Sequence, residues 1–249
     1  DVDKAPHPLG DRQYAATLRG LEAQFHGKAG DGSIYLDGGD RVYPFYRDRY
    51  VELEREGEDT IWTLLGQFGT QIHPTYGDVA GPLRNEIPEP DRSVDNTTIW
   101  TQDFNQSMYN KMLFDSTPGA NSMRNFYIEQ SSGRYAVNGI VEDWVTVPYN
   151  EARYGANYCG DIVCSTTWLF VRDSTAAWYN AQIAAGKTPA EIDAYLAQFD
   201  VWDRYDNDGD GNFNEPDGYI DHFQAVHAGE GEETGGGAQG TNAIWSHRW

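Results

Sequence analysis

The chain has 249 residues, which is long enough for one large domain with a sizeable hydrophobic core. Lys and Arg total 18 against 39 Asp and Glu, so the formal net charge is −21, and the basic residues form no run. This balance argues against nucleic acid as a partner, because phosphate backbones are bound by clustered basic side chains. No window approaches about 18 consecutive apolar residues, so no membrane span is predicted. Because the chain begins at Asp1 and not at Met, we expect a processed or excerpted piece whose signal peptide is gone.

The first part of the chain is predicted to hold one helix, two strands and a long loop. An apolar stripe at spacings of four, three and four predicts an amphipathic helix over 11–29. Residues 42–53 are rich in Tyr, Phe and Val and predict a strand, and the apolar run 61–68 is typical of a central strand. Residues 76–98 contain Pro and Gly without periodicity, which predicts a loop of a length that is usually functional or interdomain.

The middle of the chain alternates helical and extended patterns. Helices are predicted over 104–114, 120–130 and 166–185, and an extended stretch over 134–147 is rich in β-forming side chains. A further helix is predicted to begin at Thr188, because its hydroxyl can cap the first turn, Pro189 suits that turn and Glu191 can reach back. This helix is expected to end a few residues after Phe199.

The last part of the chain is predicted to form a buried strand and a mobile tail. Residues 218–228 carry the apolar pattern of a strand, and residues 234–240 are rich in glycine. The mixture of helices and strands favours an α+β or mixed α/β fold.

Cys159 and Cys164 are the two cysteines of the chain, and four residues separate them. This spacing can close a small disulfide loop in an oxidising compartment, with free buried thiols as the second interpretation. A zinc site would need further soft ligands nearby, and a redox pair would prefer two intervening residues.

Nearly half of the net charge lies between Asp200 and Glu233, where seven Asp and four Glu oppose Arg204 alone. Within this segment, oxygen-bearing side chains alternate as in a calcium-binding loop, with Gly211 at the sharp turn. A hard cation needs six to eight oxygens from a short stretch, and carboxylates gathered without a cation would repel one another. The predicted calcium ligands are Asp206, Asp208, Asp210, Asn212, Asn214 and Asp217.

The last ligand position departs from the pattern, because it holds Asp217 where a longer Glu is preferred. Glu215 or Asp221 is therefore expected to complete the shell. The alternative interpretation is a solvated acidic turn, since Asp, Asn and Gly are also turn formers. Because a strand is predicted to follow the loop, we expect a single structural calcium site and no paired EF-hand.

The six histidines give no zinc-binding motif. None of them is followed by Glu, so the chain contains no H-E-x-x-H sequence. His222 and His227 are five residues apart, which in a strand places them on opposite faces, so they are not expected to bind one metal. Each is interpreted as a packed or surface histidine.

Several segments of the chain, in this order, are informative when they are taken together. They are Asn85–Thr98, Ser122–Tyr135, Trp144–Gly155, the Asp206 loop with Asp217–His222, and Ile244–His247. Together they resemble the immune inhibitor A family of secreted bacterial zinc metallopeptidases. The resemblance covers most of the chain from about Ile61 to Trp249, and residues 1–60 resemble the tail of that family's propeptide. Residues 61–249 would then be the N-terminal part of the catalytic domain.

The resemblance implies a zincin-like fold, secretion as a zymogen, bound Ca²⁺ and cleavage of protein substrates. Such enzymes hydrolyse peptide bonds with a water activated by Zn²⁺, which an H-E-x-x-H helix holds. That motif is expected beyond this chain, so no catalytic residue or zinc ligand is assigned here. The fragment alone is predicted to be inactive and to need the remainder of its own catalytic domain. The alternative is a non-catalytic, calcium-stabilised extracellular binding module.

Overall fold

The computed structural model describes residues 56–72, 77, 79–158, 166–205 and 211–246, together with the backbone of five short strands before residue 52. These residues fall into two compact units, which we describe separately. The first contains residues 1–57 and 200–221, and the second contains residues 58–199 and 222–248.

The first unit contains two small antiparallel sheets near the N-terminus. β1 (His7–Pro8) pairs with β5 (Tyr50–Val51), and β2 (Phe25–Lys28), β3 (Ser33–Leu36) and β4 (Arg41–Pro44) form a three-stranded sheet in that order.

Two predictions for this unit are corrected. The helix predicted over 11–29 is wrong at residues 25–28, which pair with β3 and include Gly27, a poor helix former. The rest of that helix lies outside the described residues. The single strand predicted over 42–53 is replaced by β4 and β5, which pair with different partners.

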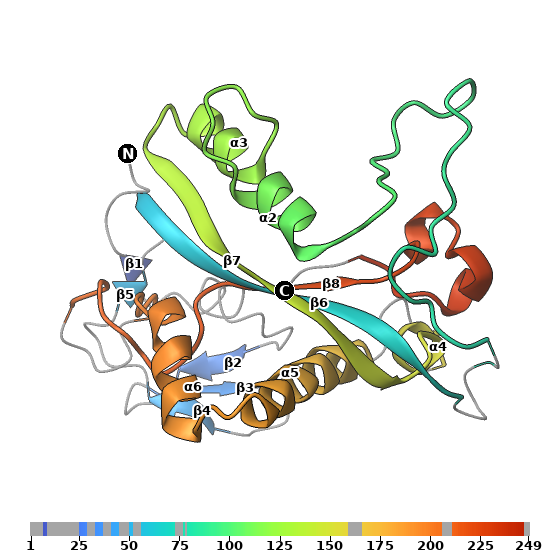
Figure 1. Ribbon diagram of the computed structural model, residues 1–249. Coiled ribbons are helices and arrows are strands. Elements are labelled where there is room, and N and C mark those ends of the chain that lie inside the picture. The colour runs from blue at the N-terminus through green and yellow to red at the C-terminus, as the bar shows by residue number, and fades with distance from the viewer. Residues whose placement is uncertain are drawn as a thin grey trace. The chain divides into compact units, whose positions relative to one another are not determined.

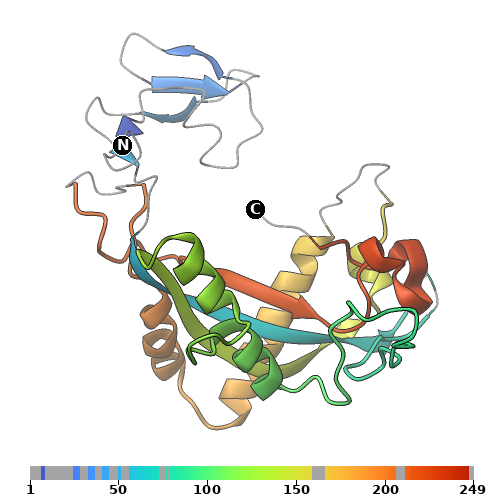
Figure 2. The same cartoon turned by 90° about the horizontal axis from the view of Figure 1, so that it is seen from above.

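The second unit is built on a three-stranded sheet in the order β7–β6–β8, in which β6 (Gly57–Gln71) is the central strand (Figure 2). β8 (Phe223–His227) runs parallel to β6. β7 (Tyr135–Tyr149) is parallel as well, because cross-strand partners rise together along both chains. These partners are Trp62 with Glu142, Gln67 with Thr146, and Gln71 with Asn150.

Because parallel strands need crossover connections, helices cover both faces of this sheet (Figure 1). The connection from β6 to β7 contains α2 (Gln106–Phe114) and α3 (Met123–Gln130). The connection from β7 to β8 contains the other helices, which are α4 (Ala152–Gly155), α5 (Thr167–Ala184), α6 (Pro189–Leu196) and the 3₁₀ turn η2 (Ala197–Phe199). The fold of this unit is therefore mixed α/β with a parallel sheet.

Most of the predicted elements in this unit are confirmed. The helices predicted over 104–114, 120–130 and 166–185 are α2, α3 and α5, and the capping box at Thr188 is formed as predicted. The helix after Thr188 ends earlier than expected, at Leu196, and the last strand is shorter than predicted, because residues 218–222 are irregular.

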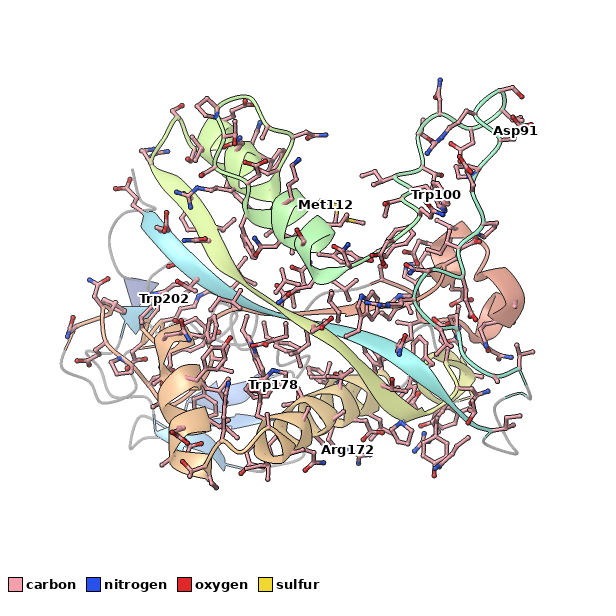
Figure 3. All side chains as sticks on the ribbon, in the orientation of Figure 1. Asp91, Trp100, Met112, Arg172, Trp178 and Trp202 are labelled. Atoms are coloured by element: carbon pink, nitrogen blue, oxygen red, sulfur yellow. The ribbon has the colours of Figure 1, made fainter. Side chains whose placement is uncertain are left out.

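Each face of the sheet has its own hydrophobic core. Leu65 and Val141 pack with Tyr109, Leu113 and Phe114 of α2, and Met112 and Trp100 adjoin this group (Figure 3). The other face is packed by aromatic rings. They are Trp62, Phe68, Tyr154, Phe170, Trp178 and Phe199.

Side chains of a regular strand alternate between the two faces of the sheet, and in β7 this alternation is interrupted once. Glu142 accepts hydrogen bonds from Trp62 and from Tyr195 of α6, on the face of α5 and α6, whereas Trp144 packs on the opposite face with α2. Residues two apart in a regular strand would point the same way, so the strand is irregular at Asp143. The irregularity brings Val147 onto the face of α5.

Gly66 lets α5 approach β6 closely. A Cβ atom at this position would lie 2.6 Å from Cζ of Phe170, whose ring is wedged among those of Phe68 and Tyr154. We expect Gly66→Ala to lower the free energy of unfolding by about 1–3 kcal/mol, because the packed ring cannot move aside. Urea unfolding measures this loss, and Thr70→Ala, at an exposed position of the same strand, should change stability by less than about 0.5 kcal/mol. Equal losses in the two variants would contradict the packing argument.

Candidate functional site

The carboxyl ends of β6, β7 and β8 lie at one edge of the sheet, where open α/β folds place their ligand sites. Three connections meet there: the loop of residues 79–105 after β6, the turn at Asn150 and Glu151 after β7, and the glycine-rich segment 228–242 after β8 (Figure 1). Backbone bonds tie the connections to the strands, from Asn150 N–H to the Gln71 carbonyl and from Ala228 N–H to the Gly66 carbonyl.

Two buried amides fix the start of the loop after β6. The Nδ2 group of Asn150 donates to the carbonyls of Gly77 and Val79, at 3.2 and 2.9 Å. The Nε2 group of Gln239 donates to the carbonyls of Val79 and Gly81, at 3.1 and 3.2 Å. These bonds hold the loop after β6 against the segment after β8.

The segment after β8 is folded into two short 3₁₀ turns. They are η3 (Glu232–Thr234) and η4 (Gly237–Asn242), and the side chain of Gln239 within η4 is buried. Residues 234–240 were predicted to be a mobile tail on their glycine content, but they are packed against the loop after β6. Their positive φ angles, as at Gly235 and Gly236, explain why glycine is needed here.

A pocket of about 240 Å³ lies between these two connections. Its apolar wall is formed by Pro82, Ile87 and Pro88, and its acidic groups are Glu86 and Glu230. The volume is below the roughly 300 Å³ from which small-molecule sites usually start, so the pocket has room for about one side chain.

At the same edge of the sheet, the fully buried Glu151 pairs with the partly buried imidazole of His227. Nδ1 of His227 lies 3.4 Å from Oε1 of Glu151 and 3.1 Å from the carbonyl of Ala228. Burial raises the pKa of Glu151 to about 8; the hydrogen bond from Ile244 N–H opposes this shift and the charge of Glu233 adds to it. Burial therefore favours the protonated form of Glu151.

His222 immediately precedes β8, whereas His227 is the last residue of that strand. Nε2 of His222 is 3.1 Å from Oδ2 of Asp59, which also accepts a hydrogen bond from the hydroxyl of Tyr135 on the α3 side of the sheet. His227 packs on Phe68 and Phe170, on the α5 side. The prediction that these two histidines lie on opposite faces is confirmed.

The described residues do not offer a zinc site. Within 56–72, 77, 79–158, 166–205 and 211–246, no three His, Cys, Asp or Glu side chains gather as metal ligands would. Among the described side chains, His222 contacts Asp59 before β8 begins, and His227 contacts Glu151 at the end of β8. The donor set therefore does not fit Zn²⁺, which needs three or four convergent ligands.

Comparison with known proteins identifies the family. The family model described as immune inhibitor A peptidase M6, catalytic domain, matches residues 47–249. The chain belongs to the M6 peptidase family.

Two relatives show how much of an M6 protein this chain represents. Immune inhibitor A of Bacillus thuringiensis subsp. alesti is 39% identical over 160 residues, which are 61% of this chain and 22% of that protein. The pre-pro-metalloprotease PrtV of Vibrio cholerae is 36% identical over 173 residues, which are 66% of this chain and 18% of that protein. The chain spans about a fifth of the length of these curated relatives.

The acidic loop of this M6 chain lies in the first unit, and only its second half is described. Asp206, Asp208 and Asp210 fall outside the described residues, as do Cys159 and Cys164, so their predicted roles stay predictions. In the second half, Asn214 N–H donates to Oδ1 of Asn212, and Tyr219 N–H donates to Oδ1 of Asp217.

The ends of the acidic loop are joined by two further aspartates. Asp200 accepts from the backbone N–H groups of Asp217 and Gly218, both at 2.9 Å, and Asp221 accepts from Val201 N–H at 2.9 Å. Glu215 and Asp221 are the two residues expected to complete a calcium shell. Glu215 accepts a hydrogen bond from Nδ2 of Asn212, and Asp221 forms the hydrogen bond to Val201 N–H at the base of the loop. The loop is thus held closed at its base by side-chain to backbone bonds.

The residues that hold the carboxyl edge of the sheet escaped the sequence analysis. Glu151, Glu233 and Gln239 belong to no catalytic or metal motif. One signal was available for Glu151, because it follows the predicted strand 134–147 by four residues, and polar groups at the carboxyl ends of parallel strands converge. For Gln239 we find no such signal.

Proposed function

We propose that this chain is the N-terminal part of the catalytic domain of a secreted, zinc-dependent metalloendopeptidase that cleaves proteins. The family match over residues 47–249 carries the proposal. The relatives named immune inhibitor A and pre-pro-metalloprotease support it. No described helix has the length and apolar character to cross a membrane.

We further propose that the zinc ligands and the catalytic base come from residues outside this sequence. The sequence contains no H-E-x-x-H, and the described histidines do not fit zinc. No hydrolytic step is therefore assigned to a residue of this chain. Its part would be to supply the parallel sheet and the connections at its carboxyl edge, against which the remainder of the catalytic domain folds.

Residues 1–60 remain proposed as a propeptide tail, and the Asp206–Asp217 loop as a calcium site that stabilises the domain. A disulfide between Cys159 and Cys164 is proposed as well, in keeping with secretion. The second candidate function is a non-catalytic calcium-stabilised binding module, which the lack of an H-E-x-x-H sequence in this chain permits.

The intact protein from which this sequence comes distinguishes the two functions. We expect it to contain about one Zn²⁺ and to hydrolyse casein, with activity lost at least 100-fold in 1,10-phenanthroline and restored by added Zn²⁺. The 249-residue chain alone should show neither zinc nor hydrolysis. An intact, folded protein that has no zinc and no peptidase activity would exclude the enzyme and leave the binding module.

A further inference from the structure

Two glutamates from different connections hold the backbone of residues 244–246. Oε1 of Glu151 accepts a hydrogen bond from Ile244 N–H at 3.0 Å. The carboxylate of Glu233 accepts from the N–H of Ser246 at 3.1 Å and from its hydroxyl at 2.5 Å. A backbone bond from Glu232 N–H to the Ile244 carbonyl completes the attachment.

The two glutamates differ in their environments. Glu151 is fully buried, and its Oε2 has no hydrogen-bond partner among the described residues. Glu233 is exposed, and hydrogen bonds from Ser246 outweigh the effect of its partial burial, so its pKa lies below the ordinary value. Water can solvate a charge on Glu233, but among the described residues only His227 is placed to neutralise a charge on Glu151.

In the part of the chain that the structure describes, few titratable groups face Glu151. They are His227 from β8 and Glu233 from η3. The backbone N–H of Glu151 donates a hydrogen bond to the Gly81 carbonyl. No titratable side chain is present in residues 79–83, around that carbonyl, or in residues 244–246. On α5, Asp173 accepts a hydrogen bond from the hydroxyl of Tyr154.

We propose that Glu151, with His227 beside it, is a pH-sensitive anchor that holds residues 244–246 to the carboxyl edge of the sheet and releases them as the carboxyl group ionises. The protonated carboxyl group fits the buried site, whereas the carboxylate is solvated only when the segment opens. This inference concerns the described residues alone and does not depend on the proposed zinc chemistry.

The sign of the pH dependence follows from the proton balance. The pKa of Glu151 is raised from 4.5 to about 8 in the folded state. Between these values the closed state keeps the proton and the opened state loses it, so opening becomes more favourable as the pH rises. The anchor is thus tightest below pH 4.5 and weakens until about pH 8, above which both states are ionised.

Hydrogen exchange of the intact protein, followed by mass spectrometry on peptides that cover residues 240–246, tests the anchor. After correction for intrinsic exchange, protection of this segment should fall at least about tenfold between pH 6 and pH 8. In Glu151→Gln, which keeps an oxygen acceptor for Ile244 N–H but cannot ionise, protection should change less than about twofold over the same range. The matched control Glu230→Gln removes a nearby charge that makes no bond to the segment and should follow the wild type.

Two results would overturn the anchor. One is a flat profile in the wild-type protein, which needs no variant and so holds even if Glu151→Gln does not fold. The other is a folded Glu151→Gln protein that retains the tenfold fall, because His227 or another group would then carry the titration.

Discussion

Replacing Trp62 with alanine is expected to lower the free energy of unfolding of the parallel-sheet unit by about 3–5 kcal/mol. The indole is almost completely buried at the centre of the aromatic face, with its ring centroid 4.9 Å from that of Trp178 and 5.4 Å from that of Phe223. Its Nε1 group also donates to Glu142 at 3.1 Å. Removal would therefore leave a large cavity and take away one of the donors to a partly buried carboxylate.

Denaturant unfolding followed by circular dichroism measures this loss, and two variants separate its causes. Trp62→Phe keeps most of the ring packing but loses the N–H group, so it should cost about 1–2 kcal/mol. Trp168→Ala removes a half-exposed tryptophan from α5 and should cost less than about 1 kcal/mol. Similar losses for Trp62→Ala and Trp168→Ala would show that Trp62 is not a central core residue.

Saturating Ca²⁺ is expected to raise the midpoint of thermal unfolding by about 5–10 °C, if the Asp206–Asp217 loop is a calcium site. A ligand present at about 100 times its dissociation constant stabilises the folded state by about 2.7 kcal/mol, and each kcal/mol shifts the midpoint of a domain of this size by about 2–4 °C. Asp208→Ala removes a predicted ligand and should abolish most of the shift. Calorimetry in EDTA and in millimolar Ca²⁺ measures both effects.

The choice of control for this experiment depends on the structure. Asp203 is the nearest acidic residue outside the ligand pattern, but it is buried and accepts a hydrogen bond from Tyr205 N–H. Asp193, exposed on α6, is a better match, and Asp193→Ala should keep the full calcium shift. Equal reductions in Asp193→Ala and Asp208→Ala would indicate diffuse charge screening, and no shift in the wild type would exclude the calcium loop.

Local patterns predicted the long elements of the parallel-sheet unit well. The capping box at Thr188 and the apolar run at 61–68 are signals within a few residues, and the elements that they mark formed as expected. Near the N-terminus the same kind of reasoning failed at Phe25–Lys28, where pairing with β3 prevails over a helical stripe. Pairing between strands is a non-local interaction, so a single stretch of sequence reports it poorly.

The sequence by itself determined the family, the charge concentration between Asp200 and Glu233, and the lack of an H-E-x-x-H motif in this chain. These are properties of residue type and spacing, which need no fold to be read. The tertiary structure alone decided that Glu151 and Glu233 hold residues 244–246 and that His227 lies beside Glu151, because the fold brings together groups up to 93 positions apart in the chain. It also decided that Glu151 is buried, and burial is what turns an ordinary glutamate into a group that titrates near pH 8.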